Sequence, residues 1–114
     1  MPIRKPQRET TIVGSILDYI KTRPDVFAYR NNTGAYRTES GGFLRYGYPG
    51  SADIIGVWNG KFLAIECKTA RGKQDIDQVR FQRDIEKCGG LYLLARSWQE
   101  VREYLTTGYL TKAP

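Results

Sequence analysis

Hydrophobic positions recur with two different spacings along the chain. In residues 12–20 the apolar side chains are three or four positions apart, which predicts a helix with one buried face. Residues 75–88 and 97–105 show similar spacing, and each begins with two capping residues three positions apart. Short apolar runs at 27–30 and 91–95 predict strands. The order of helix, strands, helix, strand and helix predicts an α/β fold, with a mixed central sheet flanked by helices.

The centre of the chain predicts a tight hairpin. Two strand-like runs, at 53–58 and 61–68, flank an Asn-Gly pair at 59–60. Asn-Gly is a strong hairpin signal because both turn residues need a positive φ. A two-residue turn fixes the register of the strands and places Asp53 opposite Glu66, with their Cβ atoms ~4.5–5.5 Å apart.

The face that these two acids share is otherwise apolar. Side chains alternate between the two faces of a strand, so Lys68 lies on the side of Glu66 and Cys67 on the other side. The apolar members of the shared face are Ile55, Val57, Phe62 and Ala64. We expect this face to be covered, and burying unpaired charge there would be unfavourable. A bound cation would remove that penalty, whereas the alternative is a set of ordinary surface charges on an exposed face.

Composition restricts the chemistry that the chain can perform. The chain has 114 residues, 40% of them hydrophobic, and we expect residues 1–114 to form one domain with its core at about 8–105. No apolar run approaches the ~20 residues of a membrane span, and residues 1–6 lack the apolar core of a signal segment, so we expect a cytoplasmic protein. Histidine is absent, which excludes His-based nucleases, Ser-His-Asp hydrolases and Cys₂His₂ fingers. Two cysteines, Cys67 and Cys88, are too few for a disulfide framework, and we expect both to be buried.

The chain is basic, with 18 Lys and Arg against 12 Asp and Glu and a net charge of +6. This charge favours a polyanionic partner, although solubility alone would also explain it. The basic residues concentrate in two places. These are the first residues (Arg4, Lys5 and Arg8) and the Gly/Tyr-rich stretch before Asp53 (Arg30, Arg37 and Arg45).

Asp53 and Glu66 suit a divalent cation, because hard cations such as Mg²⁺, Mn²⁺ and Ca²⁺ bind oxygen ligands. The backbone carbonyl of Cys67 would add a third oxygen. Such an ion favours hydrolysis of a phosphodiester, since it neutralises charge on the phosphate and activates water. Lys68 would orient or deprotonate the water, or stabilise the charged phosphorane.

Several motifs together resemble a known nuclease family. GSAD at 50–53, followed after Asp53 by a twelve-residue spacer and by Glu66 within IECK at 65–68, resembles the PD-(D/E)XK signature, with alanine where the broader signature has proline. The surroundings narrow the resemblance to the VRR-NUC domain, from about residue 8 to residue 105. The supporting motifs are RNNTGA (30–35), GYPGSADIIG (47–56), AIECKT (64–69), Gly72 with Lys73, Gln78, and Gly89 with Gly90.

The resemblance implies a restriction-endonuclease-like αβββαβ core and Mg²⁺- or Mn²⁺-dependent cleavage of DNA. It assigns Asp53 and Glu66 as metal ligands and Lys68 as the catalytic lysine. It also implies that Gln78 faces the site and that Glu9 contacts the metal, directly or through water. The alternatives are that Gln78 only completes a capping box and that Glu9 is only a first-turn acid favoured by the helix dipole.

As a stand-alone, single-domain version, the chain resembles phage or bacterial enzymes of this family, and it also resembles Holliday junction resolvases, which act as homodimers. We therefore expect an endodeoxyribonuclease for branched DNA that acts as a homodimer in a bacterial or phage-infected cell. The candidate DNA contacts are Arg30, Asn32, Arg45 and Lys73. Two alternatives remain at this point: a non-catalytic DNA-binding module that needs a partner protein, and a nuclease that acts on RNA.

Overall fold

A mixed four-stranded sheet forms the centre of the fold, with strand order β1-β4-β5-β6. The computed structural model describes residues 8–108. The predictions about Arg4, Lys5 and a signal segment in residues 1–6 therefore lie outside the described residues. The elements are α1 (Glu9–Ile20), β1 (Val26–Arg30), β2 (Gly34–Arg37), β3 (Phe43–Tyr46), β4 (Ile54–Trp58), β5 (Lys61–Cys67), α2 (Ile76–Lys87), β6 (Leu91–Ala95) and α3 (Trp98–Thr107). The predicted α/β fold with a mixed sheet flanked by helices is confirmed.

The Asn-Gly hairpin forms as the sequence predicts. Asn59 and Gly60 both have positive φ, at 52° and 74°. The strands β4 and β5 pair antiparallel from Trp58 opposite Lys61 to Ile54 opposite Ile65. This is the predicted register, and it continues toward Asp53 and Glu66. The helix α2 then returns the chain so that β6 pairs parallel to β5, which makes the sheet mixed.

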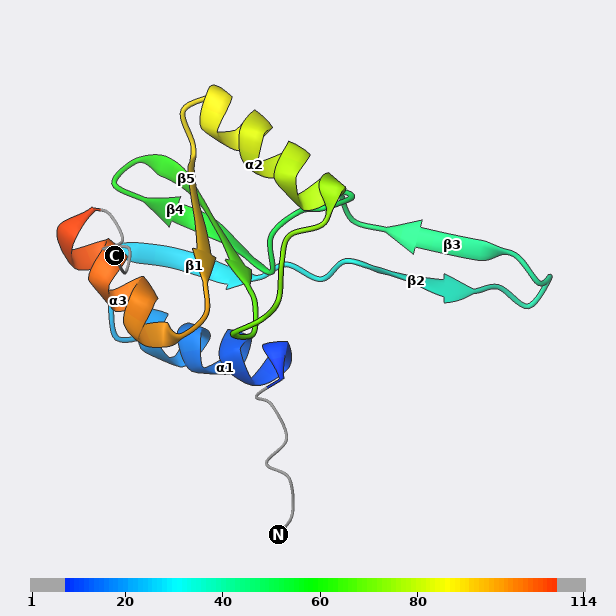
Figure 1. The fold of residues 1–114 in the computed structure, drawn as a ribbon, viewed down its shortest axis with the longest axis horizontal. Helices are drawn as coiled ribbons and strands as arrows, with labels where there is room; N and C mark the ends of the chain where they lie inside the picture. The colour runs from blue at the N-terminus through cyan, green and yellow to red at the C-terminus, as the bar shows by residue number, and fades with distance from the viewer. Residues whose placement is uncertain (1–7, 109–114) are drawn as a thin grey trace, which may run out of the picture.

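Helices cover the two faces of the sheet unequally. On one face, α1 and α3 pack on the main core, which includes Ile16, Ile54, Leu63 and Val101. Figure 1 shows α1 and α3 side by side, with α2 apart from them. On the other face, α2 inserts Phe81 in a smaller cluster of buried residues, whose other members are Ala52, Ala64 and Tyr92.

The capping residues act largely as predicted. Asp75 and Gln78 form a complete capping box at the start of α2. Ser97 accepts from the backbone N–H of Glu100, but the Glu100 carboxylate accepts from the backbone N–H of Arg96 rather than from that of Ser97. Trp58, the last residue of β4, packs on Tyr104 of α3, with ring centroids 5.9 Å apart.

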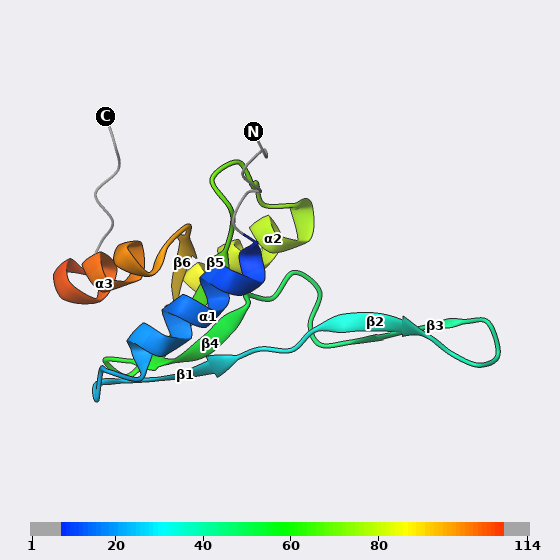
Figure 2. The same cartoon turned by 90° about the horizontal axis from the view of Figure 1, so that it is seen from below.

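Strands β2 and β3 form a separate two-stranded ribbon, where the sequence predicts a ragged hairpin and a loop. The ribbon projects away from the sheet and helices (Figures 1 and 2). All eight of its strand residues are exposed.

Two expectations about burial are wrong. The face shared by Asp53 and Glu66 is covered only in part, because α2 reaches Ala64 but leaves Val57 and Phe62 exposed. Cys88 is exposed, whereas Cys67 is buried as expected. Cys88 directly follows α2, beyond the turn of the helix that packs on the sheet.

Candidate active site

Asp53 and Glu66 lie together at one end of the central hairpin. Asp53 directly precedes β4, and Glu66 is the next-to-last residue of β5. The Asp53 carboxylate accepts a hydrogen bond of 2.8 Å from the backbone N–H of Cys67. The carboxyl groups of Asp53 and Glu66 are in hydrogen-bonding contact. The structure therefore brings the two acids together as the hairpin register predicts.

Glu66 is a buried acid without adequate compensation of its charge. The residue is 3% exposed. With both acids ionised, its Oε2 has no hydrogen-bond donor among the described residues. Burial, followed by the hydrogen bond and the charge of Asp53, raises the pKa of Glu66 to about 9. Near neutral pH, and without a cation, Glu66 therefore keeps a proton, which it donates to Asp53.

Lys68 stands beside this pair and also meets the first helix. Its charge opposes the rise in the pKa of Glu66, although burial outweighs it. Its ammonium lies 3.7 Å from Oε1 of Glu9, which begins α1. The Lys68 side chain is 11% exposed, so most of its stem is covered by protein. Glu9 thus contacts the lysine, and its contact with a metal stays a prediction.

Asn31 fixes the segment that carries Asp53. Its side-chain amide donates to the Ser51 hydroxyl at 2.8 Å and to the Ala52 carbonyl at 3.0 Å. Its backbone N–H donates to the Asp53 carbonyl at 2.7 Å. No local sequence signal predicts this role of Asn31, because its side-chain partners are twenty or more residues away.

Arg96 fixes the segment that follows Lys68. Its guanidinium donates to the backbone carbonyls of Thr69 and Gly72. A Cβ at Gly72 would lie 3.3 Å from Lys68 Cβ and Cδ, so this turn packs closely on the lysine stem. Sequence reasoning missed Arg96, since no local signal connects the end of β6 with a turn more than twenty positions earlier.

Gln78 is accounted for by the end of its helix. Its backbone N–H donates to the Asp75 carboxylate, and its side-chain oxygen accepts from the Asp75 N–H, both at 2.9 Å. Gln78 therefore completes the predicted capping box. A role for Gln78 toward metal or water remains a prediction.

The candidate DNA contacts come from separate segments of the chain. Arg30 ends β1, opposite Ile54, and its charge acts on the Cys67 thiol, whose pKa is raised mainly by burial. Asn32 and Lys73 are exposed in the segments that lead to the ribbon and to α2. Arg30 thus lies at the end of the sheet next to the segment that carries Asp53, and the DNA contacts of these residues stay predictions.

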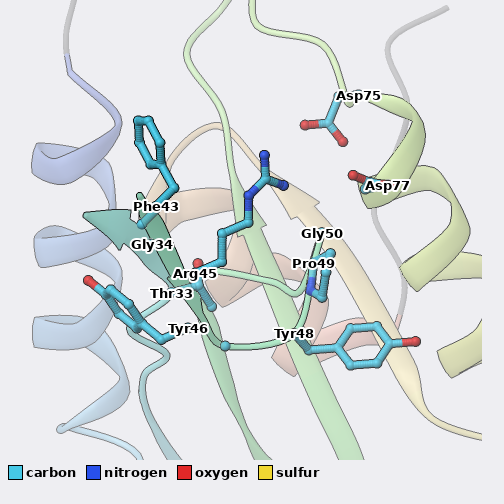
Figure 3. A pocket seen from close by; sticks show the side chains of 12 residues that line it. Thr33, Gly34, Phe43, Arg45, Tyr46, Tyr48, Pro49, Gly50, Asp75 and Asp77 are labelled. Carbon is cyan, nitrogen blue, oxygen red and sulfur yellow. The ribbon is translucent and has the colours of Figure 1, made fainter. Parts of the chain in front are cut away.

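Arg45 projects into a cavity of about 290 Å³ between the ribbon and the first turn of α2. Figure 3 shows its guanidinium pointing toward Asp75 and Asp77, with Tyr48 on the loop below. The cavity is distinct from the acidic pair, because neither Asp53 nor Glu66 lines it.

The donor set fits a hard divalent cation. Among residues 8–108, no three His, Cys, Asp or Glu side chains are grouped so that they could hold a metal ion. The side-chain ligands would therefore be the two acids alone, and further oxygens would come from the Cys67 carbonyl, water or phosphate. The buried, undonated Oε2 of Glu66 supports this fit, because a cation would supply the missing compensation.

Comparison with known proteins neither supports nor opposes a family. No protein-family model matches the chain, and no curated protein matches it. In the described part of the chain, no helix combines the length and apolar character needed to cross a membrane.

Proposed function

We propose that this chain is a divalent-metal-dependent nuclease of the VRR-NUC type, with a restriction-endonuclease-like core. The observation that carries the proposal is the pairing of Asp53 with the buried Glu66 beside Lys68. Burying Glu66 against a second acid lowers stability unless a proton or a cation compensates its charge, which favours a functional role over a structural one. The element order α1, β1, β4, β5, α2, β6 is also the order that such a core requires.

The residues have distinct roles in this proposal. Asp53 and Glu66 would hold Mg²⁺ or Mn²⁺, together with the Cys67 carbonyl, and Glu9 would act through water or through Lys68. When bound, such an ion would supply charge neutralisation at the phosphate and a more acidic water. The Lys68 ammonium, held by Glu9 and by its covered stem, stabilises negative charge on the phosphate oxygens. The capping contact of Gln78 engages only its side-chain oxygen, so its NH₂ group would orient water without loss of the cap.

DNA is the proposed substrate, and branched DNA the preferred form. Arg30, Asn32 and Lys73 would contact phosphates near the acids, and Arg45 would contact them from the ribbon. The net charge of +6 supports a polyanionic ligand. Cleavage at a four-way junction would need two copies of the site, so this substrate implies a homodimer.

Cleavage assays with labelled linear, flap, four-way-junction and RNA substrates test the proposal. We expect DNA cleavage with Mg²⁺ or Mn²⁺ and none with EDTA. Asp53→Asn and Lys68→Ala should each reduce the rate by at least a hundredfold, whereas the control Lys61→Ala, at the far end of β5, should leave it unchanged. Junction cleavage should give paired symmetric nicks.

The same assays separate the alternatives. Metal-dependent cutting that survives both substitutions would show that the site is misassigned. If the wild-type chain binds DNA with a steep salt dependence but never cuts, the non-catalytic binding module replaces the nuclease. Cutting confined to RNA would change only the substrate.

A further inference from the structure

The β2–β3 ribbon has two chemically different faces. Directly paired residues share a face, and successive residues alternate. The first face, here called the aromatic face, carries Gly34, Tyr36, Leu44 and Tyr46. The opposite face carries Ala35, Arg37, Phe43 and Arg45, with the Arg37 guanidinium over the Phe43 ring. All the cations of the two strands therefore lie on one side.

The aromatic face lacks a covering layer. The Tyr36 and Tyr46 rings contact each other, with centroids 6.4 Å apart, and Tyr46 lies over Gly34. Even so, Tyr36, Leu44 and Tyr46 remain 52%, 47% and 47% exposed. An isolated two-stranded ribbon is only marginally stable in water and needs a further layer against one face. The aromatic face is thus the side on which such a layer would pack.

A second apolar surface lies on the sheet. Phe27 pairs with Val57 and Val57 with Phe62, so the three side chains form a row across β1, β4 and β5. The Tyr29 ring contacts that of Phe27, with centroids 6.0 Å apart. This sheet patch (Phe27, Tyr29, Val57 and Phe62) lies on the face that α2 covers only toward Ala64 and Tyr92. Its members are 39–62% exposed.

We propose that a second copy of this chain covers both surfaces, with the aromatic face of each ribbon packed on the sheet patch of the other copy. Both surfaces lack charged side chains, and Arg37 and Arg45 face away from the contact. Two chains of net charge +6 can therefore associate here without burying the ribbon cations. Nucleic acid would instead bind the opposite, basic face.

The area supports a symmetric pair. A large aromatic side chain presents ~150–250 Å², so the seven half-exposed residues leave roughly 600–700 Å² to be buried per copy. A standard interface buries about 600–1,000 Å² per partner. Either surface alone falls short of this, whereas a two-fold arrangement uses both surfaces on each copy. The inference names the contact for the homodimer of the proposed function, and its test involves neither metal nor DNA.

Sedimentation equilibrium of the full chain in EDTA, without DNA, tests the proposal. We expect a dimer. Leu44→Ser with Tyr46→Ser on the ribbon, and Phe27→Ser with Val57→Thr on the sheet, should each weaken the dimer by about a hundredfold or more. Arg37→Ser, on the opposite face of the same ribbon, should leave it unchanged. Circular dichroism checks that each variant is folded.

Cross-linking tests the pairing of the two surfaces. In a Cys88→Ser background, which removes the exposed thiol, a Leu44→Cys chain and a Val57→Cys chain are mixed and treated with a short bismaleimide. We expect a cross-link between the two different chains, and none when Arg37→Cys replaces Leu44→Cys. A monomeric wild type would overturn the proposal and assign the surfaces to another partner. A dimer that tolerates either pair of substitutions would overturn the proposed contact.

Discussion

Replacing Glu66 by glutamine should change how the stability of the metal-free protein depends on pH. The pKa of Glu66 is raised from an ordinary 4.5 to about 9. Between these values the unfolded chain has released the proton and the folded chain still holds it. The folded state then binds more protons, so the free energy of unfolding falls as pH rises.

The expected size follows from the same shift. Each pH unit between the two pKa values removes about 1.4 kcal/mol, so raising the pH from 5 to 8 should lower the free energy of unfolding by about 4 kcal/mol through this group. Glutamine fits the same space, and its amide can donate to Asp53 as the protonated acid does. Glu66→Gln should therefore lose this part of the pH dependence, and at pH 8 it should be more stable than the wild type.

Urea unfolding in EDTA at several pH values between 5 and 8 measures the effect. The control is Glu86→Gln, an exposed glutamate on α2, which should follow the wild-type curve. Saturating Mg²⁺ should raise wild-type stability at pH 8 much more than that of Glu66→Gln, because ligand binding stabilises only the folded state that binds it. Parallel pH curves for the wild type and Glu66→Gln in EDTA would refute the reasoning.

Three further predictions follow from particular contacts. Arg96→Ala removes the donor to the Thr69 and Gly72 carbonyls in the turn that follows Lys68, so it should destabilise the protein by about 1–3 kcal/mol. In steady-state cleavage it should lower kcat more than it raises KM, and an effect on KM alone would show that Arg96 does not position Lys68. Gly56→Ala places a Cβ 2.0 Å from the Phe27 carbonyl oxygen and should lower Tm by many degrees. The control Gly14→Ala, in open space on α1, should stabilise the protein by up to about 1 kcal/mol, and equal Tm values for the two variants would contradict the β1–β4 packing. Arg45→Ala should reduce the salt slope of DNA binding by about 1 without altering Tm, and an unchanged slope would remove Arg45 from the DNA-binding surface.

Local signals account for most of what the sequence predicted correctly. Asn59 and Gly60 define a turn whose backbone geometry few other pairs adopt, and that turn fixes the position of Asp53 against Glu66. The Asp75 and Gln78 box is likewise defined within four residues. These features need no knowledge of the tertiary structure.

The errors and omissions come from contacts between distant segments. Asn31 and Arg96 act through backbone carbonyls far away in the chain, and no periodicity encodes such pairs. Val57 and Phe62 follow the alternation of a buried face, but α2 packs over Ala64 and Tyr92 and leaves them exposed. Hydrophobic pattern predicts that a face is apolar, whereas the covering element decides whether it is buried.

Titration calorimetry with Mn²⁺ at pH 7.5, in two buffers of different ionisation enthalpy, tests the central claim most directly. If Asp53 and Glu66 form a cation site, the wild type should bind Mn²⁺ and release a proton from Glu66 as it does so, and Asp53→Asn should abolish binding while Glu86→Gln retains it. Absence of Mn²⁺ uptake by the folded wild type, or uptake that Asp53→Asn leaves unchanged, would contradict the account.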